Sequence, residues 1–227
     1  ADSIILPSEA MKEKLLQQGL NVKKVIFQRM WDHPHDLDLH EPIFKKEVYF
    51  AGNLSRFPEL KTWEGTVPLT VFSNEEQLSL SNQVHIAGWK TDEEMLLELS
   101  KGGFGLVWTT HQNEEQNIDY YSMNVSYKLS TYLAAGIPVI IPATLSNSDF
   151  IVEQGLGFVV DNLEEANLLV EQLSEEAYLQ MCSRVRYFSF LLSQGFFAKQ
   201  FLLQAVFELG ISNNQQSRGI RLLTVTN

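Results

Sequence analysis

Short apolar segments alternate with segments of helical periodicity from residue 44 to about residue 210. The connections between them are short, and strands that alternate with helices in this way form a parallel, doubly wound sheet. The sequence therefore predicts an α/β fold, in which ligands bind beyond the carboxyl ends of the strands. The expected strands are 47–53, 68–73, 83–89, 105–110, 138–143 and 157–160, and the expected helical segments are 58–63, 91–103, 126–136, 149–155 and 163–210.

Three further segments lie outside this unit. Residues 1–31 have a strand–helix–strand pattern, with Ser8 as the N-cap of the helix. Because the chain opens with Ala1 within a strand-like run, we expect that an N-terminal part is missing. Residues 32–43 are polar and contain proline, which is typical of a linker. Residues 211–227 lack amphipathic order, so we expect an irregular tail.

The charge balance excludes several classes of partner. The chain has 17 Lys+Arg against 28 Asp+Glu, a net charge of −11, and such a field disfavours nucleic acid and anionic membranes. The longest apolar stretch, 133–145, is interrupted by glycine and proline and is too short to span a bilayer. Cys182 is the single cysteine and no signal peptide opens the chain, so we expect the reducing environment of the cytoplasm.

Polar and aromatic residues follow the ends of the expected strands, which is where a ligand would bind. Arg56 follows the first strand, and Lys128 lies one turn into the helix that begins near residue 124. A helix N-terminus beside two cations is a simple diphosphate site, and the indole of Trp89 can stack on a base. We therefore predict a nucleotide-diphosphate pocket. Its candidate residues are Arg56, Trp89, Thr109, Asn124, Ser126 and Lys128.

Each of these residues also has an ordinary structural interpretation. Arg56 is compatible with a solvated surface arginine, and Lys128 with a side chain that extends along its own helix. Asn124 is compatible with a helix N-cap, and Trp89 with core packing. Their convergence at the strand ends favours the binding site over these separate explanations.

Other candidate sites have less support. Asp32, His33 and His35 are possible metal ligands, but no cysteine pair or HExxH pattern accompanies them, and exposed linker residues explain them better. No bound metal is therefore expected. The glycines at 102–105 end a helix and precede a strand, the reverse of the order in a phosphate-binding loop, so we predict a helix stop and a tight entry into the sheet.

Seven short motifs in the chain resemble those of the GT-B glycosyltransferases, and within them the streptococcal glucosyltransferase 3 family. They occur in order over residues 1–210, and the combination of MWDHP, GGFGLVW and SYKL is the most specific part of the likeness. The motifs are MWDHP (30–34), GN followed by SRF (52–57), GGFGLVW (102–108), SYKL (126–129), LAAGIPVI (133–140), GLGF (155–158) and GFF (195–197).

This resemblance implies two facing Rossmann-like domains with a nucleotide-sugar donor in the C-terminal one, residues 44–210. Residues 1–31 would then be the end of the acceptor domain. By the same likeness Arg56 and Lys128 hold the diphosphate, Asn124 supports it and Trp89 contacts uracil. The implied reaction transfers glucose from UDP-glucose to N-acetylglucosamine on a glycoprotein, with inversion, without a metal, in a homotetramer.

Departures from the pattern leave part of the function open. Retaining GT-B enzymes often carry a glutamate where Thr131 stands, so Thr131 favours inversion. No residue can be assigned as the general base. Two alternatives remain: a noncatalytic protein of the same fold that supports another glycosyltransferase, and a different nucleotide-sugar enzyme such as an epimerase.

Overall fold

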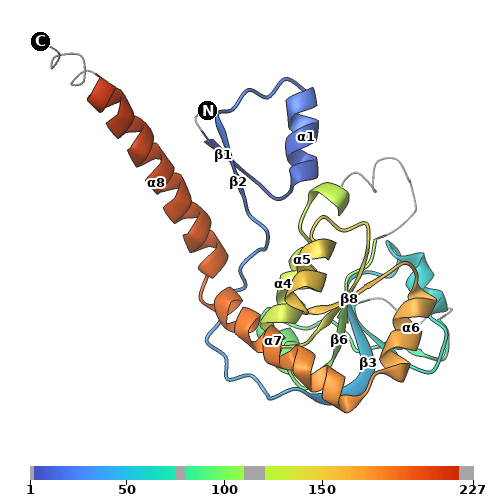
Figure 1. Ribbon diagram of the computed structural model, residues 1–227. Helices are drawn as coiled ribbons and strands as arrows, with labels where there is room; N and C mark the ends of the chain where they lie inside the picture. The colour runs from blue at the N-terminus through green and yellow to red at the C-terminus, as the bar shows by residue number, and fades with distance from the viewer. Residues whose placement is uncertain (1–2, 75–79, 110–120, 220–227) are drawn as a thin grey trace, which may run out of the picture.

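A six-stranded parallel sheet organises the chain (Figure 1), and the computed structural model describes residues 3–74, 80–109 and 121–219. The strand order is β5-β4-β3-β6-β7-β8, and every neighbouring pair is parallel. The predicted α/β fold is confirmed, and the carboxyl ends of all six strands share one edge. The strands are β3 (Ile43–Ala51), β4 (Leu69–Phe72), β5 (Val84–Ile86), β6 (Gly102–Leu106), β7 (Val139–Pro142) and β8 (Gly157–Val160).

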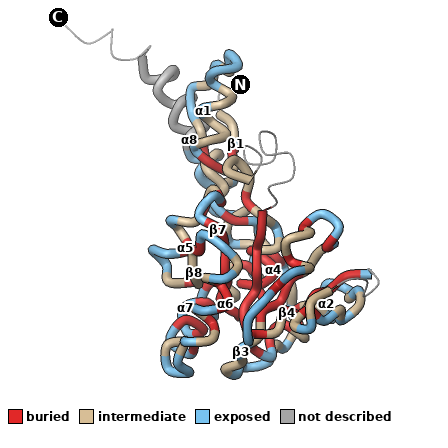
Figure 2. The backbone as a smooth tube through the Cα atoms, turned by 90° about the vertical axis from the view of Figure 1, so that its right-hand side faces the viewer, coloured by how far each residue is buried: buried red, intermediate tan, exposed pale blue. Residues whose placement is uncertain are grey.

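Helices cover both faces of the sheet and bury two apolar clusters against it (Figure 2). One cluster contains side chains of α2, α4, α5 and the second half of α7. The other contains side chains of η1, α6 and the first half of α7. Burial raises the pKa of the Cys182 thiol in this second cluster to about 11, which suits a structural cysteine. The helices are η1 (Pro58–Thr62), α2 (Asp92–Leu99), α4 (Tyr127–Ala134), α5 (Ser148–Gln154), α6 (Leu163–Gln172) and α7 (Glu175–Ser193).

Helix α4 lies unusually close to the sheet, and this contact positions the carboxyl edge. A Cβ atom at Gly105 in β6 would lie only 2.1 Å from Cγ of Tyr132 in α4. The Tyr132 side chain therefore occupies the space that any side chain at position 105 would need, so only glycine fits there. The Tyr132 hydroxyl accepts a hydrogen bond of 2.8 Å from the N–H of Ala51, the last residue of β3. One buried side chain therefore ties α4 to the ends of two strands.

Tyr132→Phe should lower the free energy of unfolding by about 1–3 kcal/mol, because the Ala51 N–H would lose its acceptor in a buried place. Chemical denaturation measures this change. Tyr187→Phe is the matched control, since the Tyr187 side chain is exposed, and it should leave stability unchanged. Equal effects of the two substitutions would contradict the role given to the Tyr132 hydroxyl.

The glycines at 102 and 103 begin β6 shortly after α2 ends, as expected for a helix stop and a tight entry into the sheet. Both have a positive φ, +118° and +94°. A Cβ at Gly102 would lie 2.0 Å from the carbonyl oxygen of Ile43, and one at Gly103 would lie 2.5 Å from the ring of Tyr49. The glycines allow β6 to approach β3 closely from its first residue.

The N-terminal residues form a separate two-stranded parallel sheet, β1 (Ser3–Leu6) and β2 (Lys24–Phe27), joined by α1 (Glu9–Gln17). As predicted, Ser8 caps α1, and its hydroxyl accepts from the N–H of Met11. In Figure 1 this unit stands apart from the large sheet and close to the last helix, α8.

Helix α8 (Phe196–Gly219) begins after Gly195, which has a positive φ of +66°. The expectation of an irregular tail is wrong for residues 211–219, which continue this helix, while 220–227 lie outside the described residues. The error arises because asparagine, glutamine and serine can extend a helix that has already formed, even without an apolar stripe. The Asp32 carboxylate accepts from the N–H groups of Phe197 and Ala198, which stabilises the start of α8.

Candidate nucleotide-binding site

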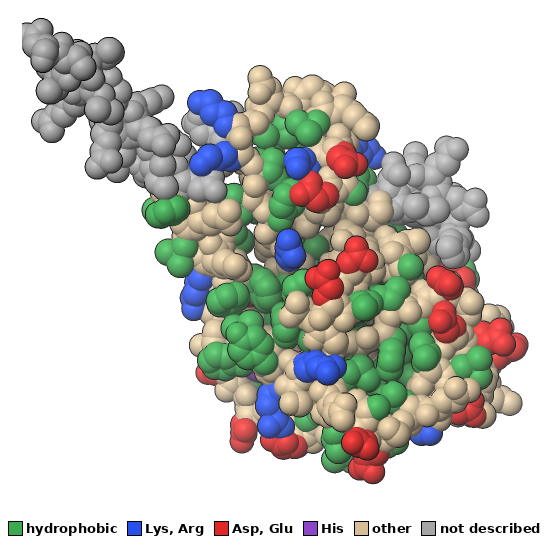
Figure 3. Space-filling view, viewed as in Figure 1, with side chains coloured by type: hydrophobic (Ala, Val, Ile, Leu, Met, Phe, Trp, Pro, Cys, Tyr) green, Lys and Arg blue, Asp and Glu red, His purple; other side chains and the backbone are tan. Residues whose placement is uncertain are grey.

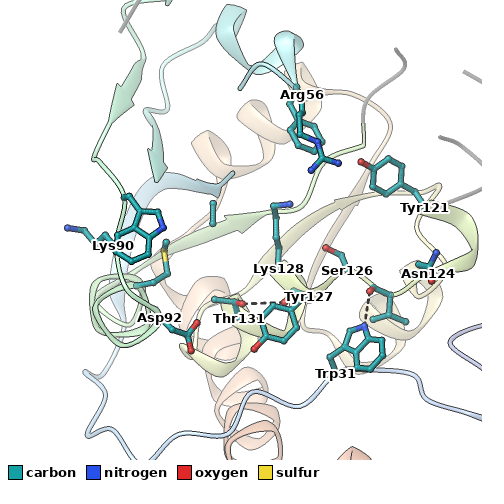
Figure 4. A pocket seen from close by; sticks show the side chains of 15 residues that line it. Trp31, Arg56, Lys90, Asp92, Tyr121, Asn124, Ser126, Tyr127, Lys128 and Thr131 are labelled. Carbon is teal, nitrogen blue, oxygen red and sulfur yellow. Dashed lines mark hydrogen bonds between the residues drawn. The ribbon is translucent and has the colours of Figure 1, made fainter. Parts of the chain in front are cut away.

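A pocket of about 730 Å³ opens at the carboxyl edge of the sheet, between the end of β3, the segment after β5 and the N-terminus of α4 (Figure 4). It brings together five of the six predicted residues. Thr109 is the exception, because it is buried after β6 and does not line the pocket. The predicted members that line it are Arg56, Trp89, Asn124, Ser126 and Lys128, and the members that the sequence did not single out for binding include Trp31, Phe57, Asp92, Tyr121 and Tyr127.

Lys128 extends from the second residue of α4 into the pocket. Its Nζ lies 5.7 Å from the ring centroid of Phe50 and 5.4 Å from that of Phe57. Burial lowers the pKa of the Lys128 ammonium from its ordinary value, and the Arg56 charge lowers it further. Within the described part of the chain no carboxylate pairs with Lys128. A desolvated cation without an anionic partner is well suited to bind an anion.

Arg56 supplies a second cation to the same pocket. The turn after β3 places it: Asn53 Oδ1 accepts from the Ser55 N–H at 2.7 Å, and the Asn53 carbonyl accepts from the Arg56 N–H at 3.2 Å. Figure 4 shows the guanidinium of Arg56 and the ammonium of Lys128 on the same side of the cavity. Two like charges held near each other favour a ligand with two negative charges.

The N-terminus of α4 opens into the same pocket. Ser126 is its N-cap but makes no side-chain capping bond, so the helix start is not closed by its own cap. The preceding backbone is held from two sides, since the Val125 carbonyl accepts from Trp31 Nε1 at 3.0 Å and the Asn124 carbonyl accepts from Ser146 Oγ at 2.9 Å. A fixed helix N-terminus adds partial positive charge to that of the two side chains.

Trp89 is 64% exposed and lines the pocket, so the alternative of core packing does not apply to it. Four further aromatic side chains, of Trp31, Phe57, Tyr121 and Tyr127, line the pocket as well. Neither tyrosine was selected for binding, because Tyr121 lies in a polar segment that has no strand pattern and Tyr127 was visible only as part of the SYKL motif. Trp31 was visible only as part of the MWDHP motif.

His33 is only 1% exposed, so the expectation that it is an exposed linker residue is wrong. Its Nε2 lies 2.9 Å from Asp92 Oδ2, and its ring stacks on Tyr127 with 5.2 Å between the centroids. The linker thus inserts a side chain beneath the pocket wall, which a polar sequence does not reveal. Within the described residues, no cluster of three or more histidine, cysteine or acidic side chains could hold a metal ion.

The face drawn in Figure 3 has no such concentration of cations among its described residues. On the face drawn in Figure 3, acidic and basic side chains of the described residues are interspersed with apolar ones, without a continuous basic patch. That distribution is in keeping with the net charge of −11, which disfavours binding to a nucleic-acid backbone. No helix in the described ranges combines the length and apolarity needed to cross a bilayer.

Comparison with known proteins identifies similar chains. The family model for "Glucosyltransferase 3-like, C-terminal domain" matches residues 48–205. The chain is 53% identical over 209 residues to glucosyltransferase 3 of Streptococcus gordonii, with 92% of this chain and 63% of that protein covered. It is 39% identical over 208 residues to glucosyltransferase 3 of Streptococcus parasanguinis, with 92% and 62% covered. The chain thus spans somewhat less than two thirds of these curated relatives.

Solved structures support the same architecture. A sucrose-phosphate synthase from Thermosynechococcus elongatus superposes with a TM-score of 0.59 at 12% sequence identity, covering 92% of this chain and 59% of that one. At this identity the likeness concerns the fold alone, and the fold is that of the GT-B glycosyltransferases. The chain matches only part of its neighbour.

Proposed function

Because the chain belongs to the glucosyltransferase 3-like family, we propose that it carries the nucleotide-sugar site of a glycosyltransferase. The observation that carries the proposal is the convergence of Arg56, Lys128 and the α4 N-terminus in one pocket with the exposed Trp89. The diphosphate of a UDP-sugar would bind the cations, and uracil would stack on the indole. Asn124 and Ser126 would complete the wall around the phosphates.

The mechanism follows from where charge develops. An acceptor hydroxyl attacks the anomeric carbon of the donor sugar and gives its proton to a general base on the acceptor side. The bond from the anomeric carbon to the diphosphate oxygen breaks, and UDP leaves. Negative charge grows on the diphosphate as it departs, and Lys128, Arg56 and the α4 N-terminus stabilise it. These groups can provide the neutralisation for which other transferases use a bound cation, so the proposal includes no metal.

We further propose that the donor is UDP-glucose and that the hexose is transferred with inversion to a sugar acceptor, N-acetylglucosamine on a glycoprotein. Thr131 lines the pocket where retaining enzymes of the fold often have a glutamate, which supports inversion. Residues 1–31 would contribute to the acceptor side, and the enzyme would act in the cytoplasm as a homotetramer. The names of the two streptococcal relatives support the glucosyl transfer.

Trp89→Ala should weaken UDP binding by roughly 5- to 150-fold, since stacking of one base contributes about 1–3 kcal/mol. Uridine should lose affinity to the same extent, because the contact involves only the base. Isothermal calorimetry with UDP and uridine measures both. Tyr187→Phe, a change to an exposed ring that does not line the pocket, is the control. Unchanged uridine affinity in Trp89→Ala would exclude stacking on this indole.

Turnover separates the enzyme from a noncatalytic protein of the same fold. The chain is incubated with UDP-glucose and an N-acetylglucosaminide, and release of UDP is followed with and without the acceptor. Acceptor-dependent release supports a transferase. The same assay is run on a longer protein that also contains the residues that precede this chain in its relatives. If that protein binds UDP-glucose tightly but releases no UDP, the noncatalytic alternative is favoured.

A further inference from the structure

A pocket suited to a diphosphate contains one feature that opposes this ligand. Of the described residues that line it, Asp92 is the only one with a carboxylate. Its side chain is 65% exposed, so it faces the cavity rather than the protein interior. A carboxylate near a bound diphosphate costs free energy through like-charge repulsion. A contact between this carboxylate and an uncharged donor of the ligand would offset the repulsion.

Asp92 is held in place by groups beneath the pocket. It is the first residue of α2, whose start is fixed by the capping box of Thr91 and Glu94. One oxygen, Oδ2, lies 2.9 Å from Nε2 of the buried His33. His33 Nδ1 in turn lies 3.4 Å from Oγ1 of Thr131. If Nε2 carries the proton, it donates to Asp92, and the other carboxylate oxygen remains open to the pocket.

The position of Asp92 matches the middle of a nucleotide. It stands three residues after Trp89 on the connection from β5 to α2, on the wall that would hold the base. In the view of Figure 4, Lys128 lies between Asp92 and Arg56. The pocket therefore presents the carboxylate of Asp92 on the same segment as the Trp89 ring, together with the two cations. In a nucleoside diphosphate the ribose lies between the base and the phosphates.

We propose that Asp92 recognises the ribose of the nucleotide and selects ligands that carry its vicinal 2′- and 3′-hydroxyls. A carboxylate only accepts hydrogen bonds, and the two hydroxyls are uncharged donors. His33 is the positioning residue, because it fixes the orientation of the carboxylate from below. The inference rests on the proposed function, since it assumes that a nucleoside diphosphate occupies the pocket.

The test compares UDP with 2′,3′-dideoxy-UDP, which keeps the base and the diphosphate, by calorimetry on the intact chain. The parent should prefer UDP by roughly tenfold or more, the effect of a hydrogen bond to a charged acceptor. In Asp92→Ala this preference should fall to within about threefold. Glu93→Ala removes the same charge from the next residue, which is exposed and does not line the pocket, and should keep the parental preference.

Each other outcome has a definite meaning. A parental preference for UDP that persists in Asp92→Ala overturns the inference and leaves the proposed function intact. Equal tightening of both nucleotides in Asp92→Ala would show that the carboxylate only repels the diphosphate, and it also overturns the inference. A loss of transfer with the parental preference unchanged would assign Asp92 to chemistry instead. A parent that binds neither nucleotide overturns the proposed function and this inference together.

Discussion

Lys128→Ala and Arg56→Ala are each expected to weaken UDP binding by roughly 10- to 150-fold, because a single charge-assisted contact contributes on the order of 1.5–3 kcal/mol. Both side chains face one cavity, and Lys128 is partly desolvated between the rings of Phe50 and Phe57. Uridine has no phosphate, so its affinity should stay close to that of the parent. Calorimetry with the two ligands separates the contribution of the phosphates from that of the base.

Lys61→Ala is the matched control for these substitutions. It removes a lysine from η1, and both η1 and Arg56 follow β3 in the chain. Unlike Arg56, Lys61 does not line the pocket. The control should bind UDP like the parent, with a small loss from the change in overall charge. Parental affinity for UDP in both Lys128→Ala and Arg56→Ala would show that these cations are surface charges, and the nucleotide site would have to lie elsewhere.

The pH dependence gives a second readout of Lys128. Only the charged ammonium attracts the diphosphate, and burial together with Arg56 lowers its pKa from the ordinary lysine value. Affinity for UDP should therefore be full at neutral pH. As the pH rises, the affinity should begin to fall at a lower pH than it would if Lys128 had the pKa of an ordinary lysine. This part of the pH dependence should be absent in Lys128→Ala and present in Lys61→Ala.

The sheet could be predicted because strand–helix alternation with short connections leaves few topologies, and parallel strands place their carboxyl ends at one edge. That rule alone brought Arg56, Trp89 and Lys128 together, although 72 residues separate the first from the last. The rule is coarse, since it places a residue at an edge without giving the direction of its side chain. Thr109 meets the rule and is nevertheless buried away from the pocket.

The contribution of the linker could not be predicted from the sequence. Residues 32–43 are polar, and polarity indicates exposure for most residues of such a segment. The burial of His33 depends on Asp92, Thr131 and Tyr127, which are 59 to 98 residues away and form the cavity that receives its ring. A binding role for Asp92 could not be predicted either, because an acidic residue in the first turn of a helix is already explained by the helix dipole.

Gly105→Ala is expected to lower the free energy of unfolding by about 3 kcal/mol or more, at the upper end of the cost of overpacking a core. The added Cβ would lie 2.1 Å from Tyr132 Cγ and 2.4 Å from Cδ2, inside a side chain that is fully buried. The ring cannot move away without giving up its hydrogen bond to Ala51 or displacing α4. Since α4 carries Ser126 and Lys128, UDP binding should weaken as well.

Gly136→Ala separates this steric effect from the conformational freedom of glycine. Gly136 follows α4 with φ +85°, and a Cβ there would have no neighbour within 4 Å, so only backbone strain of about 1–2 kcal/mol is expected. Chemical denaturation of both variants should thus show a clearly larger loss for Gly105→Ala. Equal losses would mean that β6 and α4 can separate at little cost. In that case the N-terminus of α4 would not owe its position at the pocket to the close packing of Tyr132 on Gly105.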